Sequence, residues 1–434
     1  MALWAHADKA PSSAPIGWAS RFARLRPRTI WLLGLASVGL FAGWLAMMAR
    51  QRQIDFQVYR MGGQHVLGSG LYSSSVTFEG RHLPFTYPPL AAFFFWPVSH
   101  LTVYAGSLVW DAIDLVALTA LIAVSIAAAR GRSVVASDWR TALLLLIPLG
   151  FLLFPVRQDL ELGQLNVLLV LMIVADLAVG VSWRGKKLPK GVLTGLAAAL
   201  KLTPLVFVPY LLATRQWRAA RNMAVTFVVA TGALFAVAPG ASWLYFTKDV
   251  FEVKRVGSTG LVIDQTFRAA IGRAGFSPSH ALGDLITVAV VCGGIALAVQ
   301  AHRRSSALLG VLVCAGSGLL VSPISWPHHY VWIVPAVVWL VAGVDRPAKG
   351  VYWAGAATLV FMVVPPNPPG DVDALWYIRE NAYVISTLAF FALIGTMLWL
   401  RSRTVDPESS PYAGDLKTGC AIPVLSAPHG ERSD

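Results

Sequence analysis

The sequence predicts an all-α polytopic membrane protein, because of its composition and the apolar runs that recur along it. Of its 434 residues, 56% are hydrophobic and only 13% are charged, and the mean hydropathy is +0.62. Soluble globular domains do not have this composition. The apolar runs are roughly 20 residues long, which is enough to cross about 30 Å of hydrocarbon as a helix. Helices also satisfy the backbone in lipid, and the short alternating strands of a membrane β-barrel are not seen.

Charge and cysteine usage exclude several other classes. The net charge of +13 comes from Lys and Arg clusters between the apolar runs, where they act as orientation signals and do not indicate nucleic-acid binding. The three cysteines, Cys292, Cys314 and Cys420, show no metal-binding spacing, so neither a zinc site nor a disulfide framework is predicted. No short apolar core ends in a cleavage site, so the first run is expected to be a retained helix whose N-terminus is cytoplasmic.

The first predicted elements lead from the cytoplasm to the outer face. A tail, residues 1–28, carries four arginines, and helix 29–49 follows it outward. A long first outer loop, residues 50–104, contains a short apolar piece, Leu90 to His100, which is too short for a comfortable span. We expect that piece to be a re-entrant or interfacial helix. The next spans are predicted at 104–129 inward, 141–157 outward and 165–181 inward, with Gln158 to Asn166 returning to the outer face.

Residues 191–214 predict a broken hairpin. Basic clusters flank this segment on both sides, although it is long enough to cross the membrane once. Two half-helices of about ten residues would meet at Lys201 to Pro204, because a proline disfavours helix at the residue before it. Interrupted helices are tolerated at membrane depth where they line a cavity. This hairpin would leave Lys201 near its tip, on the outer side.

The remaining elements complete a membrane domain that we place at residues 29–403. Residues 222–241 run outward into a polar outer loop, 242–280, and the tail 404–434 is predicted to be disordered and cytoplasmic. Counting half-helices, about twelve membrane segments are expected. The later spans are predicted at 281–301, 305–323, 330–344, 351–365 and 382–400, with outer turns at Ser322 to His329 and Pro365 to Asn381.

This topology gathers polar side chains on the outer face. Ionisable groups near membrane depth usually mark a functional site, and this applies most strongly to Lys201. The gathered residues are Asp55, Tyr87, Gln164, Asn166, Lys201, Gln265, Arg268, His328 and His329.

Each of these residues also has a purely structural interpretation. Lys201 could extend its side chain to the interface, and paired histidines more often pack than catalyse. Asn166 could cap the helix that follows it. Asp371 and Asp373 imitate a metal-binding pair, but they lie in a Pro/Gly-rich loop and no metal site is predicted there. Asp111 and Asp114 lie within an apolar run and receive no role.

Five motifs together resemble one enzyme family. In this order along the chain they are similar to the motif series of glycosyltransferase family 87, the actinobacterial polyprenyl-phosphate-mannose-dependent mannosyltransferases of the GT-C fold. The motifs span most of residues 50–340 and read IDFQVYRMGGQ, PFTYPPLAA, GQLNVLLV, ALKLTP and SPISWPHHYVW.

The resemblance implies a role for each residue that matches a motif. It makes Asp55 the catalytic base and places Lys201, His328 and His329 at the donor phosphate. Since that phosphate is already a good leaving group, the site needs a base and cationic donors but no general acid, and no metal or other cofactor is expected. The expected cavity wall consists of Tyr59, Tyr87, Gln164, Asn166, Gln265 and Arg268.

The resemblance also implies an activity and a location. The expected reaction moves mannose from polyprenyl-phosphate-mannose to a phosphatidylinositol mannoside through an α-1,2 linkage, with inversion, in the inner (plasma) membrane and with the active site facing the periplasm. An α-1,2 branching enzyme of lipomannan or lipoarabinomannan is the alternative within the family. A lipid or solute transporter or flippase is the alternative from a different class, although the sequence shows no related halves of the kind many transporters have.

Overall fold

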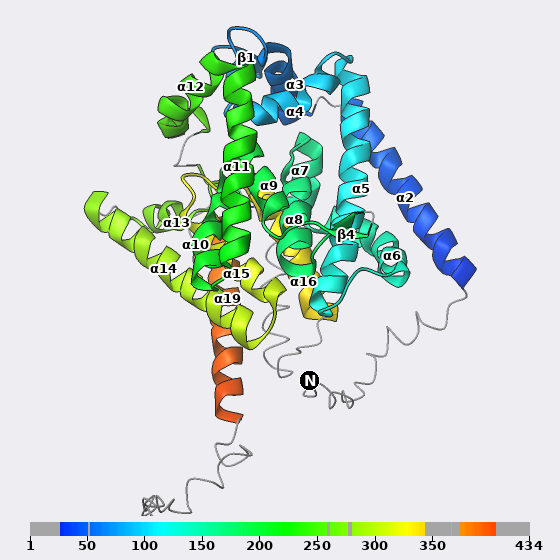
Figure 1. Cartoon of the computed structure of the whole chain (residues 1–434), viewed down its shortest axis with the longest axis vertical. Coiled ribbons are helices and arrows are strands. Elements are labelled where there is room, and N and C mark those ends of the chain that lie inside the picture. The colour runs from blue at the N-terminus through cyan, green and yellow to red at the C-terminus, as the bar shows by residue number, and fades with distance from the viewer. Residues whose placement is uncertain are drawn as a thin grey trace, which may run out of the picture.

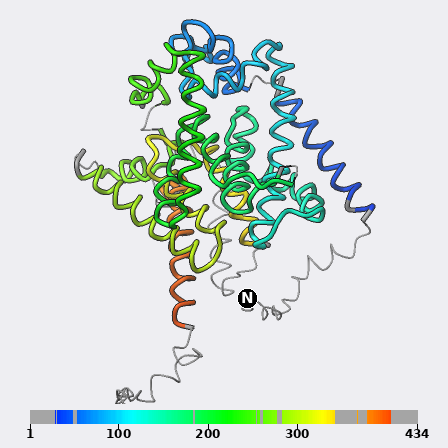
Figure 2. The backbone as a smooth tube through the Cα atoms, in the orientation of Figure 1, coloured from blue at the N-terminus to red at the C-terminus, as the bar shows by residue number. Residues whose placement is uncertain are grey.

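The computed structural model describes residues 27–50, 53–183, 185–257, 261–276, 280–342, 366 and 374–404. Helices dominate these ranges, and Figures 1 and 2 show them packed into one bundle. Strands form only two short two-stranded sheets in the described part. The predicted helical class is confirmed.

Several helices have the length and composition of membrane spans. Among the described residues, five helices are long and apolar enough to cross a membrane, or six if one bent pair counts as a single span. Shorter apolar helices follow other predicted runs. The predicted span 351–365 lies outside the described residues, as do most of the N-terminal tail and nearly all of the C-terminal tail.

Short elements cover the end of the bundle where α2 ends and α5 begins, as Figure 1 shows for α3, α4 and β1. Asp55, expected in a loop, lies instead in the first turn of α3. A carboxylate there is favoured by the partial positive charge at a helix N-terminus. The bounds are α2 Pro27–Arg50, α3 Ile54–His65, β1 Ser75–Phe78, β2 Arg81–Pro84, α4 Pro89–Ser99 and α5 Val103–Ala129.

Two glycines bring α3 close to its neighbours. A Cβ atom added at Gly62 would lie 2.6 Å from the ring of Phe85, and one at Gly63 would lie 2.9 Å from the backbone oxygen of Phe95 in α4. Larger residues would therefore push α3 outward. Because Asp55 is on α3, this close packing sets its depth in the fold.

The predicted short apolar piece forms helix α4. Phe93, Phe94 and Trp96 are exposed on it, while Phe95 points inward and is buried. A helix that keeps large apolar side chains on its outer face is suited to a membrane interface. This supports the prediction that the segment does not cross the bilayer as an ordinary span.

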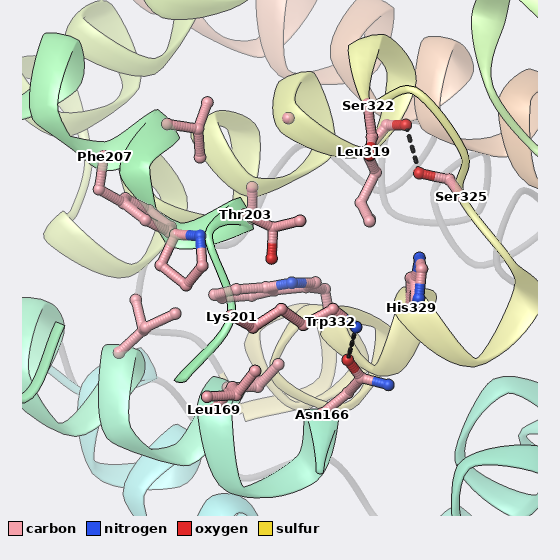
Figure 3. A pocket seen from close by; sticks show the side chains of 16 residues that line it. Asn166, Leu169, Lys201, Thr203, Phe207, Leu319, Ser322, Ser325, His329 and Trp332 are labelled. Carbon is pink, nitrogen blue, oxygen red and sulfur yellow. Dashed lines mark hydrogen bonds between the residues drawn. The ribbon is translucent and has the colours of Figure 1, made fainter. Parts of the chain in front are cut away.

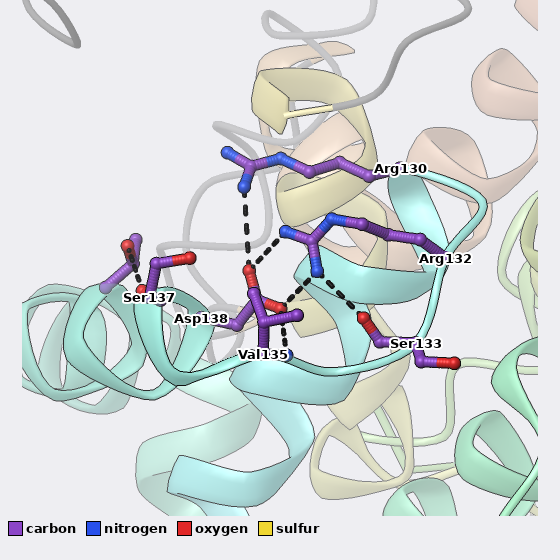
Figure 4. A network of polar contacts seen from close by, with 7 residues as sticks. Arg130, Arg132, Ser133, Val135, Ser137 and Asp138 are labelled. Carbon is purple, nitrogen blue, oxygen red and sulfur yellow. Dashed lines mark hydrogen bonds and ion pairs between the residues drawn. The ribbon is translucent and has the colours of Figure 1, made fainter.

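One cluster of basic residues does more than mark an orientation. At the turn between α5 and α6 (Ala136–Leu152), Arg132 binds Asp138 of α6 through its two terminal guanidinium nitrogens, at 2.6 and 2.7 Å, and Arg130 lies 3.5 Å from the same carboxylate (Figure 4). The backbone N–H of Val135 donates to that carboxylate at 3.0 Å. The Asp138 side chain is fully buried, so the cluster fixes the turn as well as the charge of this end.

The predicted span 141–157 is bent. Helix α6 (Ala136–Leu152) and helix α7 (Phe154–Leu162) meet at 85°. Pro155 has no N–H to continue the helix, so the backbone breaks just before it. The predicted outer turn Gln158 to Asn166 is corrected accordingly, because α7 continues to Leu162 and only the last part is a turn.

The broken helix is found where the sequence placed it. Lys201 has extended dihedral angles, φ −150° and ψ 127°, and Pro204 is the second residue of the next helical segment, which begins at Thr203. The segments around it are α8 Asn166–Val174, the π-helix η1 Ala175–Val179, β3 Ser182–Trp183, β4 Lys186–Lys187, α9 Val192–Leu200, the 3₁₀ helix η2 Thr203–Val206, α10 Phe207–Ala213 and α11 Trp217–Val237.

Contacts with α11 confirm that this segment is a hairpin. A Cβ at Gly191, which has φ +98°, would lie 2.1 Å from the carbonyl oxygen of Ala219 near the start of α11. The Asn222 side chain also donates to the carbonyl oxygen of Lys190 at 2.9 Å. Since α10 ends shortly before α11 begins, both ends of the broken segment lie at the same end of α11, and Lys201 lies at the far tip.

A buried carboxylate holds the first half-helix in place. Asp176 accepts hydrogen bonds from the backbone N–H of Gly191 at 2.9 Å and of Thr194 at 2.9 Å, and from the Thr194 hydroxyl at 2.7 Å. These bonds satisfy donors at the start of α9 that have no helical partner. The start of the hairpin is therefore fixed, and so is the position of its tip.

The C-terminal half adds the last long helices and the turn that carries the histidines. Its described elements are α12 Pro239–Thr247, η3 Asp249–Phe251, η4 Val253–Arg255, α13 Phe267–Arg273, α14 His280–Arg304, α15 Ala307–Val321, η5 Pro327–Trp332, α16 Ile333–Ala342, α18 Ala374–Glu380 and α19 Ala382–Thr404.

Candidate active site

The fold brings residues from several of the sequence motifs to one cavity of about 320 Å³. Its walls come from α3, the segment before α4, the turn before α8, the tip of the hairpin, residues 245–256 and residues 322–329. Of the residues singled out from the sequence, it is lined by Asp55, Tyr59, Tyr87, Gln164, Lys201, His328 and His329.

Asp55 is held by one side-chain hydrogen bond. The Gln164 amide nitrogen donates to Asp55 Oδ2 at 2.7 Å. Gly163 makes this possible, because it ends α7 in the left-handed conformation, φ +69°, and a Cβ there would lie 2.7 Å from Phe56. The sharp turn aims Gln164 at the first turn of α3.

Two tyrosines fix the orientation of that amide. The Tyr59 hydroxyl donates to Gln164 Oε1 at 2.6 Å, and the Tyr87 hydroxyl donates to the same oxygen at 3.2 Å. With its oxygen taken by two donors, the amide must present its NH₂ group to Asp55. Asp55 therefore accepts a hydrogen bond from this amide through Oδ2, and its Oδ1 remains available to take a proton.

The electrostatics of Asp55 suit a base that works near neutral pH. Burial raises the pKa of Asp55 to about 6, against the hydrogen bond from Gln164 and the charge of Lys201, which both lower it. A carboxylate with a raised pKa is a stronger base, yet it is still mostly ionised at pH 7. Tyr87 links the two charges, since it donates to Gln164 while Lys201 Nζ lies 5.4 Å from the centre of its ring.

Lys201 is held by a chain of buried polar groups. Its ammonium donates to Asn166 Oδ1 at 2.8 Å, and the Asn166 amide donates to Asp159 Oδ1 at 2.6 Å. Figure 3 shows Lys201 bonded to Asn166 with His329 beside them. Asn166 lies at the border of a second, mainly apolar cavity, which shares Lys201, Thr203, Ser322 and His329 with the first.

The two histidines differ in their surroundings. The backbone N–H of Trp326 donates to His329 Nδ1 at 3.2 Å, so a neutral His329 carries its proton on Nε2. His328 is buried, and neither ring nitrogen has a hydrogen-bond partner among the described residues. Both line the main cavity, but only His329 also reaches the second cavity beside Lys201.

Gln265 and Arg268 do not line this cavity, in contrast to the expectation. Gln265 is fully buried and bonds to backbone groups, donating to Glu380 O at 2.6 Å and accepting from Tyr383 N at 3.2 Å. It therefore ties the segment before α13 to the start of α19. Arg268 lines a separate cavity beyond the Ser322 turn, where it lies 3.9 Å from Asp284.

The acidic residues without a predicted role lie behind the site. Asp111 accepts a hydrogen bond from Gln53 at 2.6 Å, and Gln53 also donates to Leu160 O, which joins α3, α5 and α7. Asp114 is buried without a hydrogen-bond partner in the described part of the chain. Asp371 and Asp373 lie outside the described residues, within which no cluster of three or more His, Cys, Asp or Glu side chains could hold a metal ion.

Sequence reasoning missed a second wall of the cavity. Tyr245, Asp249, Arg255 and Trp326 all line it. The first three lie in a stretch that has no apolar periodicity and that shows only a polar outer loop in the sequence. Asp159 was missed as well. It lies near the end of α7, seven residues before Asn166 at the start of α8, so the short turn between the two helices brings both residues together.

Comparison with known proteins identifies a family and several relatives of this chain. Residues 85–323 match the model of glycosyltransferase family 87. A polyprenol-phosphate-mannose-dependent alpha-(1-2)-phosphatidylinositol mannoside mannosyltransferase of Mycolicibacterium smegmatis is 34% identical over 430 residues, which cover 90% of this chain and 95% of the relative. A protein of the same name from Mycobacterium tuberculosis is 34% identical over 333 residues, 73% and 77% of the two chains.

A further relative differs in the acceptor that its name gives. It is the polyprenol-phosphate-mannose-dependent alpha-(1-2)-phosphatidylinositol pentamannoside mannosyltransferase of Mycolicibacterium smegmatis, 30% identical over 394 residues, which cover 85% of this chain and 91% of the relative. No solved structure matches the chain.

Proposed function

From the finding that this chain belongs to glycosyltransferase family 87, we propose a specific reaction. The protein is a membrane enzyme that transfers mannose from polyprenyl-phosphate-mannose to a phosphatidylinositol mannoside through an α-1,2 linkage. The observation that carries the proposal is that a carboxylate of raised pKa, Asp55, lines the same cavity as Lys201 and His329. One cavity thus offers a base, the cationic ammonium of Lys201 and the neutral N–H donor of His329.

The chemistry is a single displacement. Asp55 takes the proton of the acceptor hydroxyl as that oxygen bonds to C1 of the donor mannose. The bond between C1 and the phosphate oxygen breaks, and polyprenyl phosphate leaves with the electron pair. Because attack and departure take place on opposite faces of C1, a β-linked donor gives an α-linked product.

Lys201 and His329 stabilise the departing phosphate. The Lys201 ammonium is buried at the cavity wall and aimed by Asn166, and His329 has its Nδ1 occupied, which leaves Nε2–H to donate. Charge-assisted hydrogen bonds to phosphate are short and strong. We assign the phosphate contact to His329 instead of His328, and we propose that these donors act without a metal ion.

The second cavity supports the placement of the donor lipid. It lies directly beyond Lys201 and is lined mainly by apolar side chains, among them Leu169, Phe207 and Trp332 (Figure 3). An isoprenoid chain attached to the phosphate would leave the site through such a surface. This supports a donor pose with the lipid among the helices and the sugar towards Asp55.

The architecture and orientation are also proposals. The long spans together with the shorter apolar helices support a GT-C membrane domain of about twelve segments. Asp55 and α3 lie at the end where α2 ends, opposite the Arg130 and Arg132 turn. By the distribution of basic residues that end faces the periplasm, in the inner membrane.

The test is transfer by the purified protein in lipid nanodiscs. Polyprenyl-phosphate-mannose is supplied with a phosphatidylinositol mannoside, or with lipomannan fragments as the alternative acceptor, and the products are analysed by mass spectrometry and by linkage. We expect α-1,2 extension of the phosphatidylinositol mannoside, unchanged by EDTA and abolished by Asp55→Asn. Full activity of Asp55→Asn would refute the assignment of the base, and preferred extension of lipomannan would change the acceptor.

A further inference from the structure

The wall that sequence reasoning missed has a chemistry of its own. Tyr245 lies near the end of α12, Asp249 begins η3 and Arg255 ends η4, and all three line the cavity that contains Asp55. Together they offer an aromatic ring, a carboxylate and a guanidinium group. This is the set of side chains that can bind the ring face and the hydroxyls of a sugar.

Two polar atoms in this wall lack partners. Asp249 Oδ2 and Arg255 Nε are buried without a hydrogen bond among the described residues. The Asp249 side chain is only 6% exposed, and its other oxygen lies 3.7 Å from Arg255 Nη1, which is an ion pair too long for a good hydrogen bond. Buried polar groups are almost always satisfied, so these atoms indicate a ligand that both donates and accepts. A hydroxyl group does both.

Contacts on both sides hold this wall in place. Arg255 Nη2 donates to the carbonyl oxygen of Tyr72 at 2.6 Å, and the rings of Tyr72 and Tyr245 stack at 5.5 Å. On the other side, a Cβ at Gly257 would lie 2.6 Å from Trp326, so the segment fits tightly against that ring. Fixing both ends in advance reduces the entropy that ligand binding must remove.

Contacts give the position of the wall relative to the reaction. The Tyr72 hydroxyl donates to the carbonyl oxygen of Tyr87 at 2.8 Å, and Tyr87 contacts the Gln164 amide that holds Asp55. Two aromatic residues therefore separate Arg255 from the base and its partner. A group bound at Asp249 and Arg255 lies beyond the hydroxyl that reacts.

We propose that Asp249 and Arg255 form an acceptor subsite, which binds the hydroxyls of the mannose adjoining the one that receives the new sugar. The inference rests on the proposed function and adds where the acceptor is recognised. The donor phosphate is an unsuitable occupant, because the carboxylates of Asp249 and the neighbouring Glu252 offset the charge of Arg255. The acceptor's neutral sugars need no net positive charge.

The experiment compares two synthetic acceptors with the full-length protein in nanodiscs. Octyl α-mannoside reaches only Asp55, whereas octyl α-1,6-dimannoside also reaches the subsite. We expect the wild type to prefer the dimannoside in kcat/KM, and Asp249→Asn and Arg255→Gln each to lower that preference ratio about tenfold, which is typical for one lost hydrogen bond to a charged group. The KM for the donor should not change.

A control variant and the ratio itself separate the outcomes. Lys248 is on the same segment, is 65% exposed and does not line the cavity, so Lys248→Gln should keep the ratio. General misfolding lowers both rates together and leaves the ratio as it was. An unchanged ratio in Asp249→Asn and Arg255→Gln variants that keep the wild-type rate on octyl α-mannoside overturns the subsite alone. If the wild type transfers to neither acceptor nor to phosphatidylinositol mannoside, the proposed function fails too.

Discussion

Replacing Gln164 with methionine should move the pH dependence of the enzyme in a direction that the structure sets. Gln164 gives Asp55 its side-chain hydrogen bond, at 2.7 Å, and that bond lowers a pKa which burial has raised to about 6. Methionine keeps the length of the side chain but cannot donate. Asp55 must be ionised to accept a proton, so activity is lost as the pH falls through its pKa.

The size of the shift follows from the strength of the lost bond. A hydrogen bond to a charged group contributes about 1.5–3 kcal/mol, and one pKa unit corresponds to about 1.4 kcal/mol. The pKa of Asp55 should therefore rise by about one to two units, to about 7 or 8. At pH 7 the ionised fraction would fall from about nine tenths to between about one half and one tenth, so kcat/KM should fall about two- to tenfold relative to its own alkaline plateau.

The assay is kcat/KM for the acceptor between pH 5 and 9, because this parameter reports the pKa of the free enzyme. The donor is a phosphodiester with no second proton to lose, so it does not titrate in this range. Gln64→Met is the matched control, since Gln64 is on the same helix as Asp55, α3, but is exposed and outside the cavity. An acidic limb that stays in place in Gln164→Met would refute the role given to Gln164, and a limb that moves in Gln64→Met would show that the shift is not specific.

Three further predictions follow from other contacts. Lys201→Met should lower kcat by at least about a hundredfold, which is the scale of losing one preorganised charge at the transition state. Thermal unfolding in nanodiscs should show that the fold is retained. A near-normal kcat would remove Lys201 from the phosphate site. Asp138→Asn should lower the free energy of unfolding by about 1–3 kcal/mol through the loss of the Arg132 contacts. The melting temperature measures this loss, and kcat/KM should not change. A melting temperature equal to that of the wild type would contradict a structural role for that turn. A cysteine at the exposed Ser69, placed in a variant without native cysteines, should react with an impermeant maleimide from outside intact cells, whereas one at Ser305 should react only after permeabilisation; the reverse pattern would invert the topology.

Sequence reasoning succeeded where the determining interaction is local. Pro204 is enough to break the hairpin at Lys201, and the structure places the break there. Pro155 was an equally local signal for the bend between α6 and α7, yet the apolar run around it was interpreted as one straight span. Local breakers thus deserve the same weight in every apolar run.

It failed where partners are distant in the chain. A glutamine in an outer loop gives no sign of whether it faces a substrate or a backbone, and Gln265 bonds to backbone atoms more than a hundred residues away. Asp249 and Arg255 were missed for the same reason, because their place opposite Asp55 is set by Tyr72, which lies 183 residues before Arg255. No periodicity or spacing records such a contact.

The turn Gly163 to Asn166 (GQLN) shows what a single short segment can determine in this fold. Its first interpretation was a helix cap, but Asn166 is already the first residue of α8, the N-cap position is Leu165, and no side chain caps the helix. Instead, Gln164 bonds to Asp55 and Asn166 bonds to Lys201, the two partners of the proposed reaction. Because only Leu165 separates them, the backbone of one turn sets the spacing between the base and the cation. The left-handed Gly163 orients the turn as a whole, so a change there would displace both groups at once, whereas a change in either amide would disturb only one.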